Sequence, residues 1–279
     1  MGAAVGRQAE AGGATVRWVR HGRSAATRQR ARDNGFQEFD DLPAALDGTD
    51  VVLSICPPEF AEDVAGQVAH SALRYTGVYV EANAIAAQRT RRIAELLPHA
   101  KVVDGGIIGE APVRAGTTRL YLSGDPHGVP GLFAGSTLQV VALPGGIGAA
   151  SALKMAYASY QKASRILAAV AHALAVEHGV DAHLMREAEL LQSFPLADVD
   201  QFPAVAAKAW RWAPEMREAA AMLRDAGLPD DLALGAAAAL DRWTCAKDRD
   251  DLDVAAVLRL LATAASRRDG ESGTARSSE

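Results

Sequence analysis

Long apolar runs and cysteines are both scarce in this chain of 279 residues. No apolar run approaches the roughly 20 residues of a membrane-spanning helix, and the N-terminal segment lacks the apolar core of a signal peptide. The two cysteines, Cys56 and Cys245, are too few and too distant for a disulfide framework or a zinc site, which fits a reducing compartment. The sequence therefore predicts a cytoplasmic protein with no membrane partner.

Metal ligands and excess positive charge are also lacking. The seven histidines are scattered without the spacing of metal ligands, so we expect no metal site. The formal net charge of -5 argues against nucleic acid as a partner, because a nucleic-acid-binding domain normally carries a basic surface. With 49% hydrophobic residues, the chain has enough apolar side chains for one large or two ordinary globular domains.

The pattern of apolar residues changes near residue 145. Before it, short apolar strands alternate with helical stretches, as in a parallel, doubly wound sheet; after it, an Ala-rich helical run at residues 148–178 is followed by helix to about residue 265. We expect strands at residues 14–19, 51–55, 78–81, 101–104, 119–123 and 138–141, with helices at 42–46, 59–69 and 88–97. The sequence predicts an α/β Rossmann-type domain at 1–145, an all-α substrate and dimerisation domain at 146–265, and a disordered tail at 266–279.

Residues 1–24 have the order of a nucleotide-binding unit without its first strand. An Ala-rich helix, a Gly12-Gly13 stop signal and a strand ending at Val19 follow one another. In a dinucleotide-binding unit this order follows a strand and a Gly-x-Gly-x-x-Gly turn, whose last glycine would be Gly2. We therefore expect a Rossmann domain truncated at its N-terminus, with a start codon about ten residues late relative to this fingerprint. The alternative is an ordinary N-terminal surface helix.

The loop after that strand is basic where an NAD-binding unit would carry an acid. An Asp or Glu there holds the ribose 2′-hydroxyl, whereas this chain has Arg20, Arg23 and Ser24. Guanidinium groups beside a hydroxyl suit a 2′-phosphate, so the sequence predicts NADP(H) as cofactor. The alternative is a solvated basic loop, continuous with the exposed face that carries Arg28 and Arg30.

A lysine follows the Gly-rich turn at residues 145–148. Lys154 lies about two turns into the next helix, on a face shared with Tyr157 and Ala158. The chain has only five lysines against 24 arginines, and burial can lower a lysine pKa until the amine is a usable proton donor or acceptor. Lys154 is therefore the candidate general acid or base; the alternative is a lysine that extends its amine to solvent at a helix edge.

A series of short stretches along the chain carries a family pattern: residues 52–58, 80–84, 103–109, 118–124, the Lys154 helix and 209–216. In their order and spacing these stretches resemble the 6-phosphogluconate dehydrogenase and 3-hydroxyacid dehydrogenase superfamily, and within it the NAD(P)-dependent oxidoreductases with a phosphogluconate dehydrogenase-like helical C-terminal domain. The resemblance implies hydride transfer to or from a nicotinamide, with Lys154 as the helix lysine. It implies that Pro57 and Pro58 pack along the dinucleotide and that Asn83 lies near the nicotinamide.

Three departures from the family pattern bear on the substrate. The family's Ser-Gly-Gly after the fifth strand is Ile108-Gly109-Glu110 here, its asparagine one turn after the lysine is Ala158, and its Lys-Asp-Leu is Pro214-Glu215-Met216. The lost contacts make a small hydroxyacid or phosphogluconate a poor substrate and favour a larger or less charged carbonyl or imine. Gly109, Tyr157, Trp212 and Glu215 are the expected pocket residues, although the tryptophan could equally be core packing.

The sequence thus predicts an NADPH-dependent oxidoreductase that transfers hydride between the nicotinamide and a carbonyl or imine carbon of a small molecule. The alternative is a noncatalytic NADP-binding dimeric scaffold. An imine reductase proper ranks lower, because such enzymes usually place Asp or Tyr at the lysine position. We also expect a homodimer built by the helical half, since residues 148–178 and 204–240 are too apolar for a single compact layer.

Overall fold

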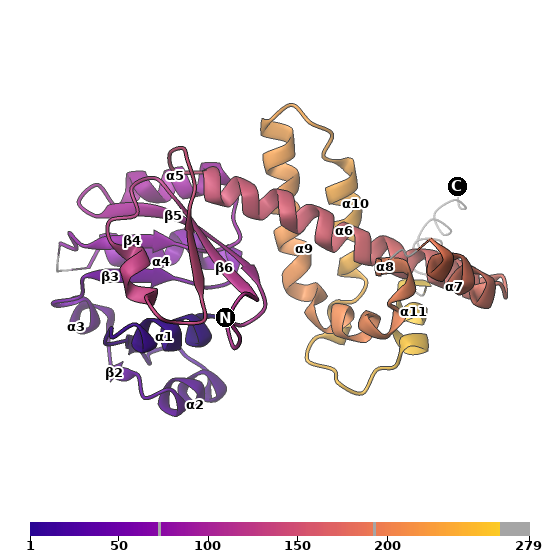
Figure 1. Cartoon of the computed structure of the whole chain (residues 1–279), viewed down its shortest axis with the longest axis horizontal. Helices are drawn as coiled ribbons and strands as arrows, with labels where there is room; N and C mark the ends of the chain where they lie inside the picture. Colours follow the sequence, from indigo (N-terminus) through magenta and orange to yellow (C-terminus); the bar gives the residue numbers. More distant parts are fainter. Residues whose placement is uncertain (72–73, 192–193, 263–279) are drawn as a thin grey trace, which may run out of the picture. The chain divides into compact units, whose positions relative to one another are not determined.

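A computed structural model describes residues 1–71, 74–191 and 194–262 of the chain (Figure 1). Its contacts divide the chain into two compact units, of which the first covers Met1–Tyr157 and the second begins at Ala158. The disordered tail expected at residues 266–279 lies outside the described residues. Among the described residues, no helix combines the length and apolar character needed to cross a bilayer.

A five-stranded sheet forms the centre of the first unit. Its strands run in the order β3-β4-β5-β6-β7, and every neighbouring pair is parallel except β5 and β6. Only the loop at 110–117 joins β5 to β6, so the chain turns back beside β5 instead of crossing over through a helix. The strands are β3 (Val51–Ser54), β4 (Val78–Glu81), β5 (Lys101–Gly109), β6 (Thr118–Ser123) and β7 (Gln139–Ala142).

A second, two-stranded parallel sheet contains β1 (Arg17–Val19) and β2 (Gln37–Phe39). The sequence did not predict β2, because this short strand is mostly exposed and polar. The first helix, α1 (Gly2–Ala11), precedes β1, and α2 (Ala25–Asp33) joins β1 to β2. The order helix, glycine, strand expected at the start of the chain is therefore present.

The two sheets do not pair with each other. The carbonyls of Asp50 and Ser54 accept hydrogen bonds from the β4 side, so the alternate residues Val51 and Leu53 direct their backbone groups to the opposite edge of β3. By the same alternation, the bonds of Val16 and Arg20 to β2 leave the other edge of β1 open. No described strand occupies either edge, and the strand expected ahead of Gly2 stays a prediction.

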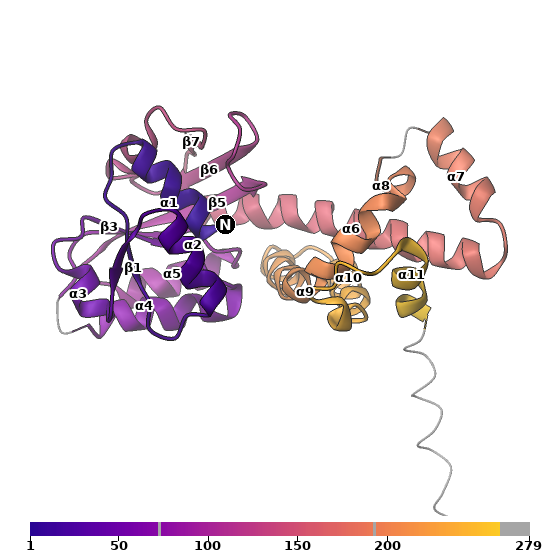
Figure 2. The same cartoon turned by 90° about the horizontal axis from the view of Figure 1, so that it is seen from below.

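Helices cover both faces of the larger sheet (Figure 2). On one face, Val5 and Ala9 of α1 pack with Val80 of β4 and with η2 (Val129–Phe133). On the other face, Tyr79 of β4 packs with two helices. These are α4 (Ala61–Ala69), preceded by η1 (Pro58–Phe60), and α5 (Ala87–Leu96); α3 (Leu42–Leu46) precedes β3. The expected α/β Rossmann-type architecture is confirmed.

The second unit is helical, as predicted, with no strand among its described residues. Phe202, Met216, Leu240 and Trp243 are fully buried in its core, and the Trp243 indole donates to the Val257 carbonyl at 2.7 Å. The helix α6 (Ala149–Glu177) begins in the first unit and continues into the second. The others are α7 (Asp181–Leu190), α8 (Phe194–Ala197), η3 (Val199–Gln201), α9 (Phe202–Asp225), α10 (Asp231–Asp241), η4 (Thr244–Ala246) and α11 (Val254–Ala262).

Candidate functional site

A row of buried polar side chains crosses the larger sheet. Ser54 of β3, Glu81 of β4, Asp104 of β5 and Ser123 of β6 are successive register partners, so all four point to the same face. Each is at most 3% exposed. Ser54 and Glu81 are the last residues of their parallel strands, at the edge where open α/β sheets bind their ligands, and Asp104 lies level with them in β5.

Asp104 clamps the start of α6. Its Oδ2 accepts from the backbone N–H groups of Gly148 and Ser151, at 2.9 and 3.0 Å, and from the Ser123 hydroxyl at 2.8 Å. Its Oδ1 accepts from the Ser151 hydroxyl, and the Ser123 Oγ accepts from the Ala150 N–H. The first amides of α6, which have no partner within the helix, are thus satisfied by the chain's own acid and hydroxyl.

The Gly-rich turn before α6 serves this packing. A Cβ atom on Gly148 would lie 2.9 Å from the Arg91 guanidinium and 3.0 Å from the Ala87 Cβ, both on α5, and its φ of +112° favours glycine in any case. Gly148 therefore allows α6 to begin against α5.

Lys154 lies where α6 crosses β5. A Cβ on Gly106 would be 2.7 Å from the Ala150 carbonyl oxygen and 3.2 Å from the Lys154 Cβ, so the helix rests directly on the strand. Lys154 is half-buried, and its helix is fixed from below by Gly106 and at its start by Asp104. The predicted proton-transfer residue is thus held on a rigid element next to the polar row.

Asn83 braces the carboxyl ends of β3 and β4. Its Oδ1 accepts from the Cys56 N–H at 2.5 Å, and its Nδ2 donates to the Ser54 Oγ at 2.9 Å. Its own N–H donates to Oε1 of Glu81 at 2.9 Å. The Asn83 side chain is buried, so it holds in place the turn that continues into the predicted cofactor residues Pro57 and Pro58.

Gly2 approaches the same edge. A Cβ on Gly2 would lie 3.6 Å from the Ile55 carbonyl oxygen, so α1 begins beside the carboxyl end of β3. The structure therefore groups Gly2 with the turn at Cys56 and Pro57. Of these three residues, the sequence assigned Gly2 and Pro57 to the cofactor.

The two candidate arginines for the 2′-phosphate differ in what they contact. Arg20 forms ion pairs with Glu38 and Asp40 at the end of β2. The exposed side chain of Arg23 makes no hydrogen bond or ion pair within the described part of the chain. Ser24 is the N-cap of α2, with its Oγ accepting from the Thr27 N–H at 3.3 Å.

Arg23 acts electrostatically on the turn after β3. Burial raises the pKa of the Cys56 thiol to about 11, the Glu81 carboxyl adds to the rise, and the Arg23 cation opposes it. Cys56 itself stays a thiol at neutral pH and is a poor nucleophile.

Of the two pocket residues predicted in the helical half, Glu215 belongs to a buried ion pair and Trp212 lies beside it. Glu215 of α9 binds the Lys162 ammonium of α6, and the two side chains are 13% and 4% exposed. The Lys162 Nζ also lies 5.5 Å from the centre of the Trp212 ring. Sequence reasoning missed Lys162, although it is one of only five lysines and lies in an apolar helix. Glu215, the acid that remains in the altered Lys-Asp-Leu motif, thus pairs with a lysine of another helix.

The other two predicted pocket residues belong to the first unit. Gly109 ends β5 with a φ of +120°, and a Cβ there would overlap the Thr117 carbonyl oxygen at 2.1 Å. The return of the chain into β6 therefore requires a glycine, whatever else this residue does. Tyr157 is 42% exposed on α6. A pocket that joins these residues to Trp212 and Glu215 stays a prediction.

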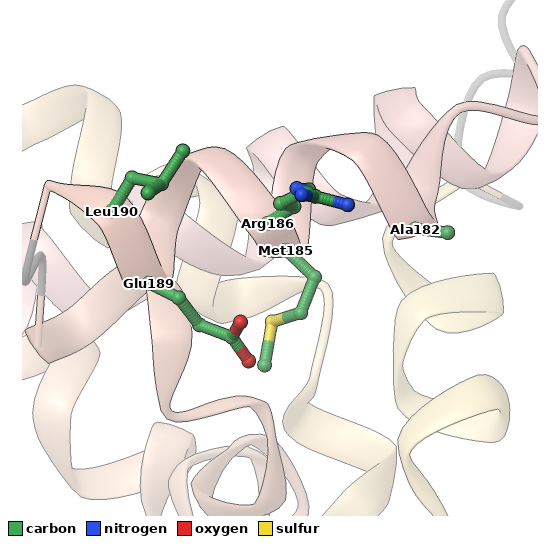
Figure 3. A pocket seen from close by; sticks show the side chains of 5 residues that line it. All are labelled: Ala182, Met185, Arg186, Glu189 and Leu190. Atoms are coloured by element: carbon green, nitrogen blue, oxygen red, sulfur yellow. The ribbon is translucent and has the colours of Figure 1, made fainter.

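One hollow lies along α7 and has a volume of about 660 Å³. Its lining comes from one helix only, and in Figure 3 Met185 and Glu189 extend to the same side of it. The lining residues are Ala182, Met185, Arg186, Glu189 and Leu190. No predicted site residue is among them, and no three His, Cys, Asp or Glu residues in the described ranges are placed to hold a metal ion.

Comparisons with known proteins agree with this architecture. Residues 171–243 match a family model described as a domain of unknown function, DUF1932. No curated protein matches the chain. The 3-hydroxyisobutyrate dehydrogenase of Mycobacterium tuberculosis, solved with L-serine, is 20% identical with a TM-score of 0.70, covering 94% of this chain and 95% of that one.

Two further solved structures extend the comparison. The 3-hydroxyisobutyrate dehydrogenase of Salmonella typhimurium is 15% identical, with a TM-score of 0.67. A reductive aminase from Aspergillus terreus, in complex with NADPH and ethyl levulinate, is 18% identical, with a TM-score of 0.56. Each match covers 93% of this chain and 95% of the other. The resemblance read from the sequence is confirmed at the level of the fold.

Proposed function

We propose that this chain, which has the fold of the 3-hydroxyacid dehydrogenases, is an NADPH-dependent oxidoreductase acting on a carbonyl or imine carbon. The observation that carries the proposal is the fixed position of Lys154: its helix is clamped by Asp104 and rests on Gly106, beside the strand ends. Gly2 and Asn83 lie at those strand ends as well. Hydride-transfer enzymes require a proton-transfer group on a rigid element, next to the edge of the sheet where the cofactor binds.

The residues present fit the 2′-phosphate end of NADP(H). Arg23 is a cation without a protein partner in the described residues, and Ser24 opens α2 beside it. Arg20 already binds two acids and is the weaker candidate. The A. terreus neighbour was solved with NADPH, which supports the same cofactor here. When bound, NADPH supplies the hydride.

Lys154 would handle the proton of the reaction. In the reducing direction, an ammonium at Lys154 Nζ donates a proton to the carbonyl oxygen or imine nitrogen as negative charge develops there; in the oxidising direction, the amine accepts it. The half-buried position on α6 limits the movement of the side chain's base. General acid catalysis of this kind contributes about 10²- to 10⁴-fold in rate.

The test is NADPH oxidation by the parent chain and by Lys154→Ala against aldehydes, ketones and cyclic imines. We expect the variant to lose about 10²- to 10⁴-fold in kcat while NADPH affinity is retained. Lys101→Ala, which removes an exposed lysine at the start of β5, is the matched control and should keep full activity. Full activity in Lys154→Ala would move the chemistry to another residue. NADPH binding without turnover of any substrate would instead support the noncatalytic scaffold.

We propose further that the helical half forms a homodimer. Several large apolar side chains on its helices are exposed, among them Leu167 of α6 at 69% and Leu190 of α7 at 70%, the latter beside the hollow in Figure 3. Monomers rarely leave so many large apolar groups in water, and two-fold pairing would bury them. Light scattering at micromolar concentration should give twice the chain mass; a monomer mass would contradict the proposal.

The two cysteines are both free, which fits a reducing compartment, and we keep the cytoplasm as the expected location.

A further inference from the structure

Two carboxyl groups lie side by side in the buried polar row. Glu81 and Asp104 are register partners on adjacent parallel strands, which are about 4.7–4.9 Å apart. Both residues have zero exposure to solvent. Because the two side chains are neighbours on one buried face, their carboxylates would repel each other, and ionising both would cost free energy; such pairs favour a proton on one member.

Hydrogen-bond donors are distributed unequally between the two acids. Asp104 accepts four hydrogen bonds, from two backbone N–H groups and the hydroxyls of Ser123 and Ser151. Glu81 accepts one at Oε1, from the Asn83 N–H, and its buried Oε2 has no hydrogen-bond partner in the described residues. Asp104 therefore acts only as an acceptor, whereas Glu81 has an oxygen free of donors that can carry a proton.

We propose that Glu81 is a positioning residue that works as a neutral acid and links the Asn83 brace to the Asp104 clamp. With its proton in place, Glu81 holds the Asn83 backbone and puts no second charge beside Asp104. When the proton is lost, a carboxylate stands next to the anion that fixes the start of α6 and hence Lys154. The effect on turnover rests on the proposed function; the effects on folding and on the carboxyl group itself do not.

The surroundings of Glu81 contain few other titratable groups. Asp104 faces it from β5, Tyr79 shares its face of β4, and Cys56 follows β3. The helices α5 and α6 contribute the hydroxyls of Thr90 and Ser151, which bond to each other at 2.9 Å, and α6 adds the N–H groups of Ala150 and Ser151. Cations on these helices include Arg91 of α5, beside Gly148, and Lys154, the first charged residue of α6. No lysine or arginine side chain bonds to Glu81 within the described residues, so nothing compensates its charge directly.

The balance of these groups raises the pKa of Glu81 to about 7. Burial is the main cause, the neighbouring polar groups of Asn83 and Ser54 oppose it, and Asp104 adds to the rise. Because the folded value exceeds the unfolded one, folding takes up a proton between about pH 4.5 and 7. The contribution of Glu81 to stability is complete below this window and is lost as the pH rises through 7.

The decisive variant is Glu81→Gln, because glutamine has the shape of the protonated acid and cannot lose a proton to become an anion. In the parent, the folding equilibrium constant should fall by up to about tenfold per pH unit across the window, and thermal unfolding between pH 5 and 8 should show a falling midpoint. Glu81→Gln should remove this contribution. Glu95→Gln, which changes an exposed acid on α5, is the matched control and should titrate like the parent.

A second measurement needs no variant to be active. Infrared difference spectra of the folded parent should show a carboxylic acid carbonyl band that disappears as the pH rises through 7, and Glu81→Gln should lack it. If Glu81→Gln does not fold, the titration of this band in the parent still decides the matter. A parent with no such band at pH 6, or a Glu81→Gln variant with an unchanged pH dependence of unfolding, would overturn the proposal. Where turnover is found, its limb near pH 7 should vanish in Glu81→Gln while that in Glu95→Gln remains; absence of turnover would refute the proposed function alone.

Discussion

The beginnings of α6 and α2 lie in the same unit but are satisfied in opposite ways. At α6, Asp104 and Ser123 bind the first amides, and all of these groups are buried. At α2, Ser24 alone caps the helix, the loop is exposed, and Arg23 has no protein partner in the described residues. The first helix start is closed by the protein's own anion, whereas the second is open to an anion from outside. The comparison separates the part of the candidate site that holds Lys154, the proposed proton-transfer residue, from the part that would hold a ligand.

Removing the Asp104 side chain should have the largest effect on stability. Asp104→Ala leaves the amides of Gly148 and Ser151 and two hydroxyls without their acceptor in a buried site, so unfolding should become easier by about 4 kcal/mol or more. Urea denaturation measures this, and Asp63→Ala, which removes an exposed acid on α4, should change stability by less than about 0.5 kcal/mol. Equal effects in the two variants would mean that α6 does not depend on the clamp.

A methyl group under α6 should have a smaller effect. Gly106→Ala would place its Cβ 2.7 Å from the Ala150 carbonyl oxygen, and overpacking against backbone costs about 1 to 3 kcal/mol. Because the same contact supports Lys154, kcat should fall while NADPH affinity holds. Gly146→Ala is the control in the turn before α6, since nothing lies within 4 Å of its added Cβ. A Gly106→Ala variant as stable and active as the parent would show that α6 can shift without consequence.

At the start of α2, substitutions should change the affinity for NADPH and not the stability of the fold. Arg23→Ala should weaken NADPH binding by about 1 to 3 kcal/mol, because one charge-assisted phosphate contact is lost, and should barely alter NADH binding. Arg20→Ala should have less effect on NADPH, since Glu38 and Asp40 already occupy its guanidinium. Titration of cofactor fluorescence measures both. Equal affinity of the parent for NADPH and NADH would remove the basis for a phosphate site at Arg23.

The sequence predicted the larger sheet well and the contacts between its elements poorly. Runs of β-branched residues such as 51–55 identified strands, because burial in a parallel sheet demands such residues. The strand β5 continues past the expected end at Asp104. The prediction ended too early because the next two residues are glycines, which interrupt the apolar pattern although they serve close packing. The antiparallel pairing of β5 with β6 was not predicted, because the length of the loop between them does not by itself show which way the chain turns.

The candidate site divides in the same way. Lys154 and the basic loop were found from local composition, because a rare residue type or an unusual charge is visible in the chain itself. The clamp at Asp104 and the pairing of Lys162 with Glu215 join residues 44 and 53 positions apart. No periodicity in one sequence encodes such pairs, so their partners could only be found in the folded chain.

The separation of the two sheets has a consequence for local opening. A continuous sheet loses its hydrogen bonds as one cooperative unit, whereas two unpaired sheets can open one without the other. The pair β1 and β2 has three residues in each strand and carries the loop with Arg23 and Ser24 at one end. Its amide hydrogens should therefore exchange with solvent well before those of β4 and β5, which lie inside the larger sheet. The loop with Arg23 and Ser24 is thus attached to the sheet that we expect to open first. A ligand bound there would slow the hydrogen exchange of backbone amides that exchange rapidly in the protein alone.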